Sequence, residues 1–210
     1  MRVIVTCGPS YEPIDEVRRI TNFSTGELGV RLANRLARDG HEVTCFRGVA
    51  ATRALTLDGP AHVPFSTNDD LLEKLDAVVE RERVGAVFHA AALADFRVER
   101  GGGQRKISSR AGTITLTLVP ATKLIAKLRA LFPNAWIVGW KYELDGTRDE
   151  AIAKAHRQLA ENGTDVCVVN GAAYGGGFGF LTRDGALTHV ADRVVLAEFL
   201  AAQLAQRPMV

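Results

Sequence analysis

A group of small and polar residues stands directly before an amphipathic stretch of the chain. The group consists of Ser24, Thr25 and Gly26. Directly after it, Leu28, Leu32 and Leu36 recur at every fourth position, which predicts a helix with one buried face. Ser24 and Glu27 also match a capping box, in which two side chains satisfy free N–H groups at a helix start. Because such N–H groups attract anions, we expect a nucleotide or phosphate site here.

The residues before this group predict the floor of that site. Val3 to Cys7 is short, apolar and rich in β-branched residues, as in a fully buried, parallel strand. Residues 8–21 then predict a loop with no secondary structure of its own. Loops of this length are more often functional than not in a compact domain.

A dinucleotide-binding fold is the competing interpretation, and its glycine spacing is missing. The fingerprint G-x-G-x-x-G follows the first strand tightly, whereas Gly26 and Gly29 come much later here. The second predicted strand, Glu42 to Phe46, ends in Arg47 instead of an acidic residue. An arginine at that place tolerates NADP, so an NADP-dependent or other nucleotide- or flavin-binding Rossmann-like protein stays as the alternative.

Composition bounds the class of protein. The chain has 210 residues, of which 47% are hydrophobic and 24% charged, and its net charge is +2. Without a long basic run we expect small-molecule partners, not nucleic acid or a membrane surface. The N-terminus has no signal pattern, and no apolar run approaches the roughly 18 residues of a membrane span, so we expect a cytoplasmic protein.

Cysteine and histidine positions argue against a protein-built metal site. Cys7, Cys45 and Cys167 lie in apolar strands and are expected to be buried free thiols. The five histidines show no ligand spacing with each other or with a cysteine. We expect no metal site from protein side chains alone.

Strands and helices alternate in the first half, which predicts a parallel sheet covered on both faces. The expected segments are strand 62–65, helix 70–82 capped by Thr67 or Asn68, and strand 85–89. Ligands of such sheets bind at the carboxyl ends of the strands. Those ends are Gly8, Arg47, Ala90 to Asp95, Trp140 to Glu143, and Asn170.

The alternation is interrupted between residues 95 and 120. Thr113 to Val119 alternates at period two, as in a half-buried strand, and Gly101 to Gly103 forms a glycine tip. We expect a protruding flap or dimerisation arm here. Alternation then resumes with helix 122–131, strand 135–140, helix 149–161, strand 166–169, a hairpin of 178–181 and 186–190, and helix 192–206.

The closing helix is expected to carry Val195, Phe199 and Leu200 inward. No linker divides the chain, so the prediction is one domain, 1–210. Its fold class is α/β, a Rossmann-like three-layer sandwich with a mostly parallel sheet and a protruding β arm.

Several blocks of the sequence resemble the phosphopantothenate–cysteine ligases (phosphopantothenoylcysteine synthetases). The match is to the synthetase domain of the DNA/pantothenate metabolism flavoprotein type, in its stand-alone form. The blocks are Glu12 to Asp15 with Val17 and Arg18, Ile20 to Gly26, Ala90 to Arg97, Lys106 with Ile107, Val138 to Trp140 with Glu143, and Asp165 to Asn170. They cover nearly the whole chain in order.

The resemblance implies a reaction of coenzyme A biosynthesis. ATP or CTP activates the carboxylate of 4′-phosphopantothenate as an acyl-nucleotidylate, with Mg²⁺, and the amine of cysteine then displaces the nucleotide. The resemblance also implies a homodimer and leaves room for a separate flavin-dependent decarboxylase. Such chemistry needs cations for the phosphates and donors for the acyl oxyanion.

Site residues follow from the matched positions. The resemblance gives Asn22 and Lys106 catalytic roles, Asn22 at the acyl-nucleotidylate and Lys106 on a flap over the phosphates. It implies nucleotide contacts for Gly8, Ser10, Ser24, Thr25, Gly26, Ala91, Ala92, Asp95, Trp140, Lys154 and Arg157. Trp140 is interpreted equally well as a core residue. The alternative for Asn22 is a plain helix cap, and the alternative for Lys154 and Arg157 is a solvated pair on one helix face.

The chain departs from the bacterial fused enzymes of that family at a few positions. Ser108 and Ser109 follow Lys106-Ile107 where further lysines are usual, and Ala121-Thr122 stands in place of Asp-Ile after Pro120. Glu161 replaces a common lysine, and Thr25 a common serine. These changes are closer to the branch that uses ATP, so ATP versus CTP stays open.

Overall fold

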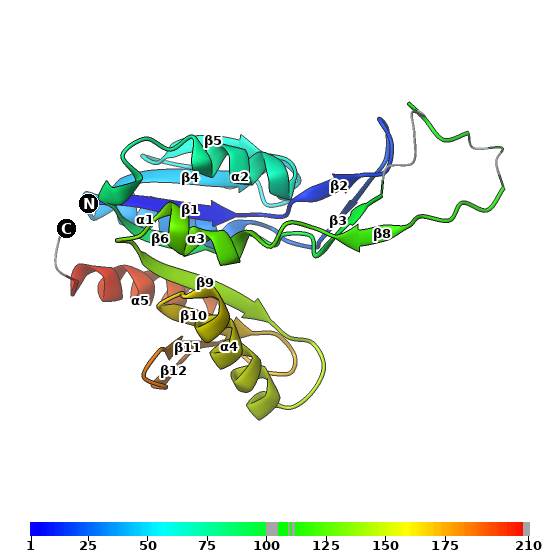
Figure 1. Ribbon diagram of the computed structural model, residues 1–210. Helices are drawn as coiled ribbons and strands as arrows, with labels where there is room; N and C mark the ends of the chain where they lie inside the picture. The colour runs from blue at the N-terminus through cyan, green and yellow to red at the C-terminus, as the bar shows by residue number, and fades with distance from the viewer. Residues whose placement is uncertain (100–104, 109, 111, 208–210) are drawn as a thin grey trace.

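A twisted sheet of eight strands runs through the protein. The computed structural model describes residues 1–99, 105–108, 110 and 112–207. The strand order is β12-β11-β10-β9-β6-β1-β4-β5 (Figure 1). The six parallel strands are β1 (Arg2–Cys7), β4 (Glu42–Gly48), β5 (Ala61–Phe65), β6 (Val84–His89), β9 (Trp136–Tyr142) and β10 (Val166–Asn170). The two antiparallel pairings join β11 (Phe178–Thr182) to β10 and to β12 (Leu187–Val190).

Helices cover both faces of the sheet. The helices α1 (Glu27–Arg38) and α5 (Arg193–Ala205) pack on one face, where Leu32, Leu36 and Leu200 are fully buried. The other face carries α2 (Asn68–Asp76), α3 (Leu128–Leu131) and α4 (Arg148–Asn162), with the 3₁₀ turns η1 (Arg81–Arg83) and η2 (Leu124–Lys127). The predicted Rossmann-like α/β sandwich with a mostly parallel sheet is confirmed. No helix in the described residues is both long and apolar enough to cross a membrane.

The start of α1 differs from the predicted capping box. The N-cap is Gly26 in a left-handed conformation (φ +72°), and no side chain caps the helix. A Cβ atom on Gly26 would lie 3.1 Å from the Ala51 Cβ and 3.4 Å from the Gly8 Cα. Since this packing needs a glycine at the cap, Ser24 stays outside the helix and the predicted Ser24–Glu27 capping box is wrong.

The segment expected to be an unstructured loop contains a β-hairpin. β2 (Tyr11–Pro13) pairs antiparallel with β3 (Arg19–Thr21). Asp15 closes the turn, since its carboxylate accepts hydrogen bonds from the backbone N–H groups of Val17 (2.8 Å) and Arg18 (2.7 Å). The prediction of a loop without secondary structure over residues 8–21 is therefore wrong, because three-residue strands are too short to leave a periodic pattern.

A second short hairpin forms the base of the arm. β7 (Phe96–Val98) pairs antiparallel with β8 (Leu118–Pro120), and the arm extends beyond the sheet next to β2 and β3 (Figure 1). The strand predicted over residues 113–119 is present only at its last two residues. A strand needs a partner to pair with, and Phe96–Val98 pairs with residues 118–120 alone. The expected glycine tip at 101–103 lies outside the described residues.

The predicted helices 70–82 and 122–131 differ in their bounds from the structure, and α5 differs in which residues point inward. Helix 70–82 ends at Asp76, and helix 122–131 is divided into η2 and α3. In α5, Leu196 is fully buried, whereas Val195 is 48% exposed. The expectation that Val195 points inward is therefore wrong by one position, while Leu200 is buried as expected.

Asn68, at the start of α2, ties both ends of the arm to the body of the protein. The side chain is 2% exposed, and its Nδ2 donates to the carbonyls of Ala94 (2.8 Å) and Thr122 (3.2 Å). The Ala121 N–H donates to the Asp95 carbonyl at 2.9 Å between these two points. Of the two predicted N-caps of α2, Thr67 is the one observed. The Asn68 side chain is therefore available to hold the arm.

Replacing Asn68 with alanine should therefore lower the free energy of unfolding by about 1–3 kcal/mol, because two partly buried carbonyls lose their donor. Urea unfolding measures this change, and the Ala121 amide should exchange its hydrogen faster. Asn134→Ala is the matched control, since Asn134 is exposed and donates once, to the Glu82 carbonyl. Equal effects of the two substitutions would contradict the role of Asn68.

Candidate active site

Residues far apart in the sequence meet where β1 and β6 end. Asn22 lies ahead of α1, and its Nδ2 donates to the carbonyl of Leu93 at 2.9 Å and, more weakly, to that of Ala92 at 3.4 Å. Ser10 is fully buried, and its Oγ accepts a hydrogen bond from the Ala94 N–H at 2.9 Å. The structure thus brings Asn22 and Ser10 onto the segment that begins with Ala91 and Ala92.

The glycines of the site allow neighbouring loops to pack closely. Gly8 has φ +75°, and a Cβ there would lie 3.0 Å from the Ala51 Cβ and 3.3 Å from the Gly48 nitrogen. The loop after β4 thus covers one side of Gly8 and Gly26. Thr25 is part of the same junction, since its carbonyl accepts from the Arg53 N–H at 3.2 Å and its Oγ1 from the Glu27 N–H at 3.3 Å.

A buried carboxylate organises the cations after β9. The Glu143 side chain is 12% exposed and forms ion pairs with Lys141 (3.0 Å) and with Lys154 of α4. Desolvation would raise the pKa of Glu143, but hydrogen bonds and charge from the two lysines outweigh it, so that the pKa lies below its usual value of 4.5. Lys154 is therefore held at the carboxyl edge, and Arg157 lies exposed one turn further along α4.

Trp140 does not lie beside Lys154. Like Leu28, it packs against the core of the α1 and α5 face, whereas α4 covers the opposite face. Its Nε1 is buried and has no hydrogen-bond partner among the described residues. Of the two readings of Trp140, its packing matches that of a partly buried core residue.

The arm presents Lys106 beside the β2–β3 hairpin. Its neighbours are both fastened there: the Arg105 carbonyl accepts from the Glu16 N–H at 3.0 Å, and the Ile107 N–H donates to the Asp15 carboxylate at 3.1 Å. Lys106 itself is exposed, as is Asp95 at the base of the arm. The sequence reasoning assigned no role to Asp15, although its place in the first matched block was a signal.

The three thiols are buried in the strands of the sheet. Hydrogen bonding to Cys7 and burial both raise the pKa of Cys45, and burial raises the pKa of Cys167 to about 12. The expected buried free thiols are confirmed. Within the described parts of the chain, no three His, Cys, Asp or Glu side chains cluster so as to hold a metal ion.

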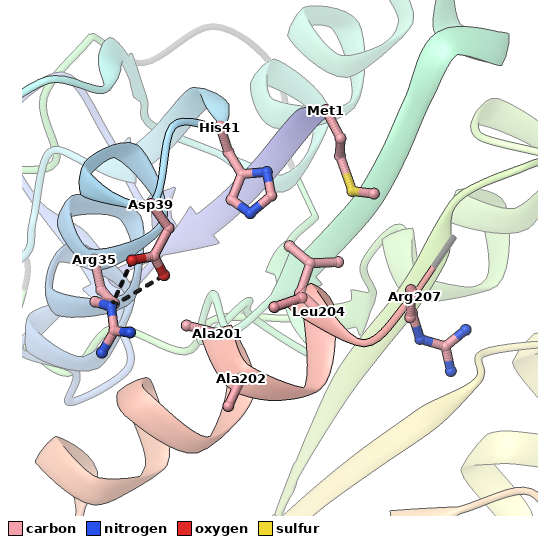
Figure 2. A pocket seen from close by; sticks show the side chains of 9 residues that line it. Met1, Arg35, Asp39, His41, Ala201, Ala202, Leu204 and Arg207 are labelled. Atoms are coloured by element: carbon pink, nitrogen blue, oxygen red, sulfur yellow. Dashed lines mark hydrogen bonds and ion pairs between the residues drawn. The ribbon is translucent and has the colours of Figure 1, made fainter. Parts of the chain in front are cut away.

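A shallow cavity of about 320 Å³ lies elsewhere, between the C-terminal parts of α1 and α5 (Figure 2). His41 points into it, and Arg35 and Asp39 form an ion pair at its side (Figure 2). Because Met1, at the amino end of β1, also lines it, this cavity lies at the edge of the sheet opposite the site residues.

The fold is that of Rossmann-like α/β proteins, whose ligands bind at the carboxyl edge of the sheet. Residues 1–205 match the DNA/pantothenate metabolism flavoprotein C-terminal domain, and the chain belongs to this family. It is 31% identical over 169 residues to the coenzyme A biosynthesis bifunctional protein CoaBC of Thermococcus kodakarensis, covering 80% of this chain and 41% of that protein. The chain thus spans less than half the length of this relative.

Solved structures share the fold. The DNA/pantothenate metabolism flavoprotein from Streptococcus pneumoniae superposes with a TM-score of 0.84 at 24% identity, covering 98% of each chain. A Cab2 variant in complex with phosphopantothenate-cysteine superposes with a TM-score of 0.76 at 18% identity, covering 98% of this chain and 86% of that one. At identities this low, the similarity to these structures shows the fold alone.

The lowered pKa of Glu143 predicts a pH-dependent contribution to stability. The carboxylate contributes fully above its usual pKa of 4.5, and the contribution is lost as the pH falls through the lower folded pKa. Glu143→Gln should be less stable at pH 7 by about 1–3 kcal/mol, since charged hydrogen bonds are lost. Below pH 4.5 the difference from the wild type should shrink.

Urea unfolding at a series of pH values measures this difference. Glu161→Gln is the matched control, because Glu161 is 55% exposed and lies 3.9 Å from its partner Lys123. A difference between wild type and Glu143→Gln that stays constant with pH would contradict the proposed cause.

Proposed function

We propose that this protein is a phosphopantothenate–cysteine ligase of coenzyme A biosynthesis. The carboxylate of 4′-phosphopantothenate attacks the α-phosphorus of a nucleoside triphosphate and releases pyrophosphate. The amine of cysteine then attacks the acyl carbon, so that the amide forms and the nucleoside monophosphate leaves with loss of a proton from the amine. Membership of the family and the names of its relatives support this proposal.

One observation carries the proposal furthest: the contact between Asn22 and Leu93. It joins two matched blocks that are 71 residues apart in the sequence, and Asp95 follows two residues later. The Asn22 amide is exposed at this rim, and the N–H of its weaker bond, 3.4 Å to the Ala92 carbonyl, can turn to a bound acyl-nucleotidylate while the bond to Leu93 is kept. Donors fixed in this way stabilise the charge that develops on phosphorus and on the acyl oxygen.

Cations and carboxylates at the same edge suit the triphosphate. Lys106 is an exposed point charge that can follow the developing negative charge, and Lys154 can turn from Glu143 to phosphate oxygens. Mg²⁺ prefers one or two carboxylates together with phosphate oxygens, and Asp95 is an exposed carboxylate there. When bound, the ion would neutralise phosphate charge.

For the nucleotide we propose ATP, because of the departures from the bacterial fused enzymes at Ser108, Ser109 and Glu161.

We further propose that the protein forms a homodimer through the arm and works in the cytoplasm. Exposed apolar side chains gather on the two small hairpins and the residues next to them. They are Val17, Ile20, Phe23, Phe96, Ile114 and Leu118. Apolar groups this exposed mark an interaction surface. On the family resemblance, we also propose a separate flavin-dependent decarboxylase as a partner.

The function is tested by replacing Asn22 with aspartate. Pyrophosphate release by the wild type should require phosphopantothenate, and amide formation should require cysteine as well. In Asn22→Asp, amide formation should fall by at least about 100-fold, as when an oxyanion donor is lost, while the intermediate accumulates. Asn134→Asp, at a surface site, should leave both steps unchanged.

Normal turnover by Asn22→Asp would refute the role given to Asn22. Absence of any substrate-dependent pyrophosphate release from the wild type would instead favour a nucleotide- or flavin-binding module without ligase activity. The same assay, run with ATP and with CTP, decides the nucleotide.

The dimer is tested by Leu118→Glu, which puts a charge on the arm. Sedimentation velocity should show a dimer for the wild type and a monomer for the variant, because burying an unpaired carboxylate costs several kcal/mol. Val79→Glu is the control, since Val79 is also exposed, and its carbonyl accepts a hydrogen bond from Arg2 at the amino end of the sheet, away from the arm. A monomeric wild type would end the proposal.

A further inference from the structure

Three arginines surround one carboxylate where α1 and α5 begin. Glu27 is the first residue of α1, and its side chain is 9% exposed. It pairs with Arg31 at 2.8 Å, with Arg193 at 2.9 Å and, at a longer 3.9 Å, with Arg53. We call Arg31, Arg53 and Arg193 with Glu27 the arginine cluster.

The arginine cluster carries a surplus of two positive charges. Among the residues that the structure describes, none of its arginines has another carboxylate within 4 Å. Their side chains are 38%, 57% and 52% exposed, so each reaches the solvent. A guanidinium has five N–H donors, whereas a carboxylate has about four acceptor positions, so many donors remain for a ligand.

Other arginines of this protein use their donors for the backbone. Arg129 and Arg183 share Asp165, which is also a two-to-one arrangement. However, Arg129 donates to the carbonyls of Gly163, Pro133 and Ala135, and Arg183 to those of Thr164 and Gly163. In the described residues, the side chains of Arg31 and Arg193 donate to Glu27 alone. The arginine cluster therefore differs from an arrangement that only ties loops together.

The arginine cluster lies close to the carboxyl edge of the sheet. Arg53 is held from two sides: its N–H donates to the Thr25 carbonyl, and its own carbonyl accepts from the Arg47 side chain. Arg47 also donates to the Leu55 carbonyl at 2.9 Å, which fixes the loop. Arg193 stands at the first position of α5, where the helix dipole is unfavourable for a cation. Cations gathered against this field would gain from an anion in addition to Glu27.

We propose that the arginine cluster binds a phosphate group of a substrate. The ligand class is a phosphomonoester dianion or the end of a polyphosphate, because guanidinium groups bind phosphate through paired N–H donors. Glu27 is a positioning residue that holds the guanidinium groups together and keeps them oriented. The inference deepens the proposed function: the phosphate belongs either to 4′-phosphopantothenate or to the nucleotide.

Steady-state kinetics of Arg53→Ala and Arg193→Ala test the inference and separate the two sources. We expect the KM for one phosphorylated substrate to rise about 10- to 100-fold per arginine, as for loss of a charged hydrogen bond, with kcat nearly unchanged. If the KM for phosphopantothenate rises, pantothenate without its phosphate should be used equally by wild type and variants. If the KM for the nucleotide rises, the site belongs to the triphosphate.

Arg53→Lys should restore part of the affinity, since it keeps the charge but not the paired donors. The control is Arg83→Ala, because Arg83 is 66% exposed and pairs with Glu80 away from the carboxyl edge. Unchanged KM values for both phosphorylated substrates in both alanine variants would overturn the inference.

A binding measurement keeps this inference separate from the ligase proposal. Calorimetry with pyrophosphate should give binding to the wild type and to Arg83→Ala, and at least 10-fold weaker binding to Arg53→Ala and Arg193→Ala. This result without ligase activity would support the site and refute the proposed function. Equal pyrophosphate binding by all four proteins would refute the site, whatever the activity.

Discussion

Close approach of glycine residues to neighbouring segments holds the carboxyl edge of the sheet together. A Cβ on Gly29 would lie 2.2 Å from the Cys7 Cβ, and one on Gly48 would lie 2.1 Å from the Pro9 carbonyl oxygen. Helix α1 and the loops after β1 and β4 therefore meet more closely than any other residue type permits. Everything proposed for the site depends on this contact, because it fixes Asn22 relative to Leu93 and Glu27 relative to Arg53.

Shielded carboxylates organise the cations around this edge. Glu143 holds two lysines, Glu27 holds three arginines, and Asp15 fastens Arg18 and the backbone next to Lys106. A shielded carboxylate surrounded by cations loses much of its solvation, so it persists only when its partners are well placed. The chain has a net charge of only +2, so the positive potential is local. Polyanionic substrates would meet it at the edge where the strands end.

Longer elements were predictable, and short ones were not. The buried strands and the helices α1, α4 and α5 have enough residues to show their period, so the sheet and its covering layers follow from the pattern. β2, β3, β7 and β8 have three residues each, and their pairing depends on Asp15 and on Asn68 instead of on any pattern. Likewise Gly26, and not Ser24, is the N-cap of α1, because the neighbouring Gly8 and Ala51 leave room only for a glycine.

The sequence by itself determined the order of strands and helices, the edge at which polar residues collect, and the motifs that identify the family. Tertiary structure decided which side chains share a face and which charges meet. Trp140 points from β9 toward the face that α1 and α5 cover, whereas Lys154 lies on α4, which covers the opposite face, and Glu27 meets Arg193 across 166 residues of chain. Such contacts depend on how whole elements pack, and the packing of distant elements leaves no local trace in the residues that it joins.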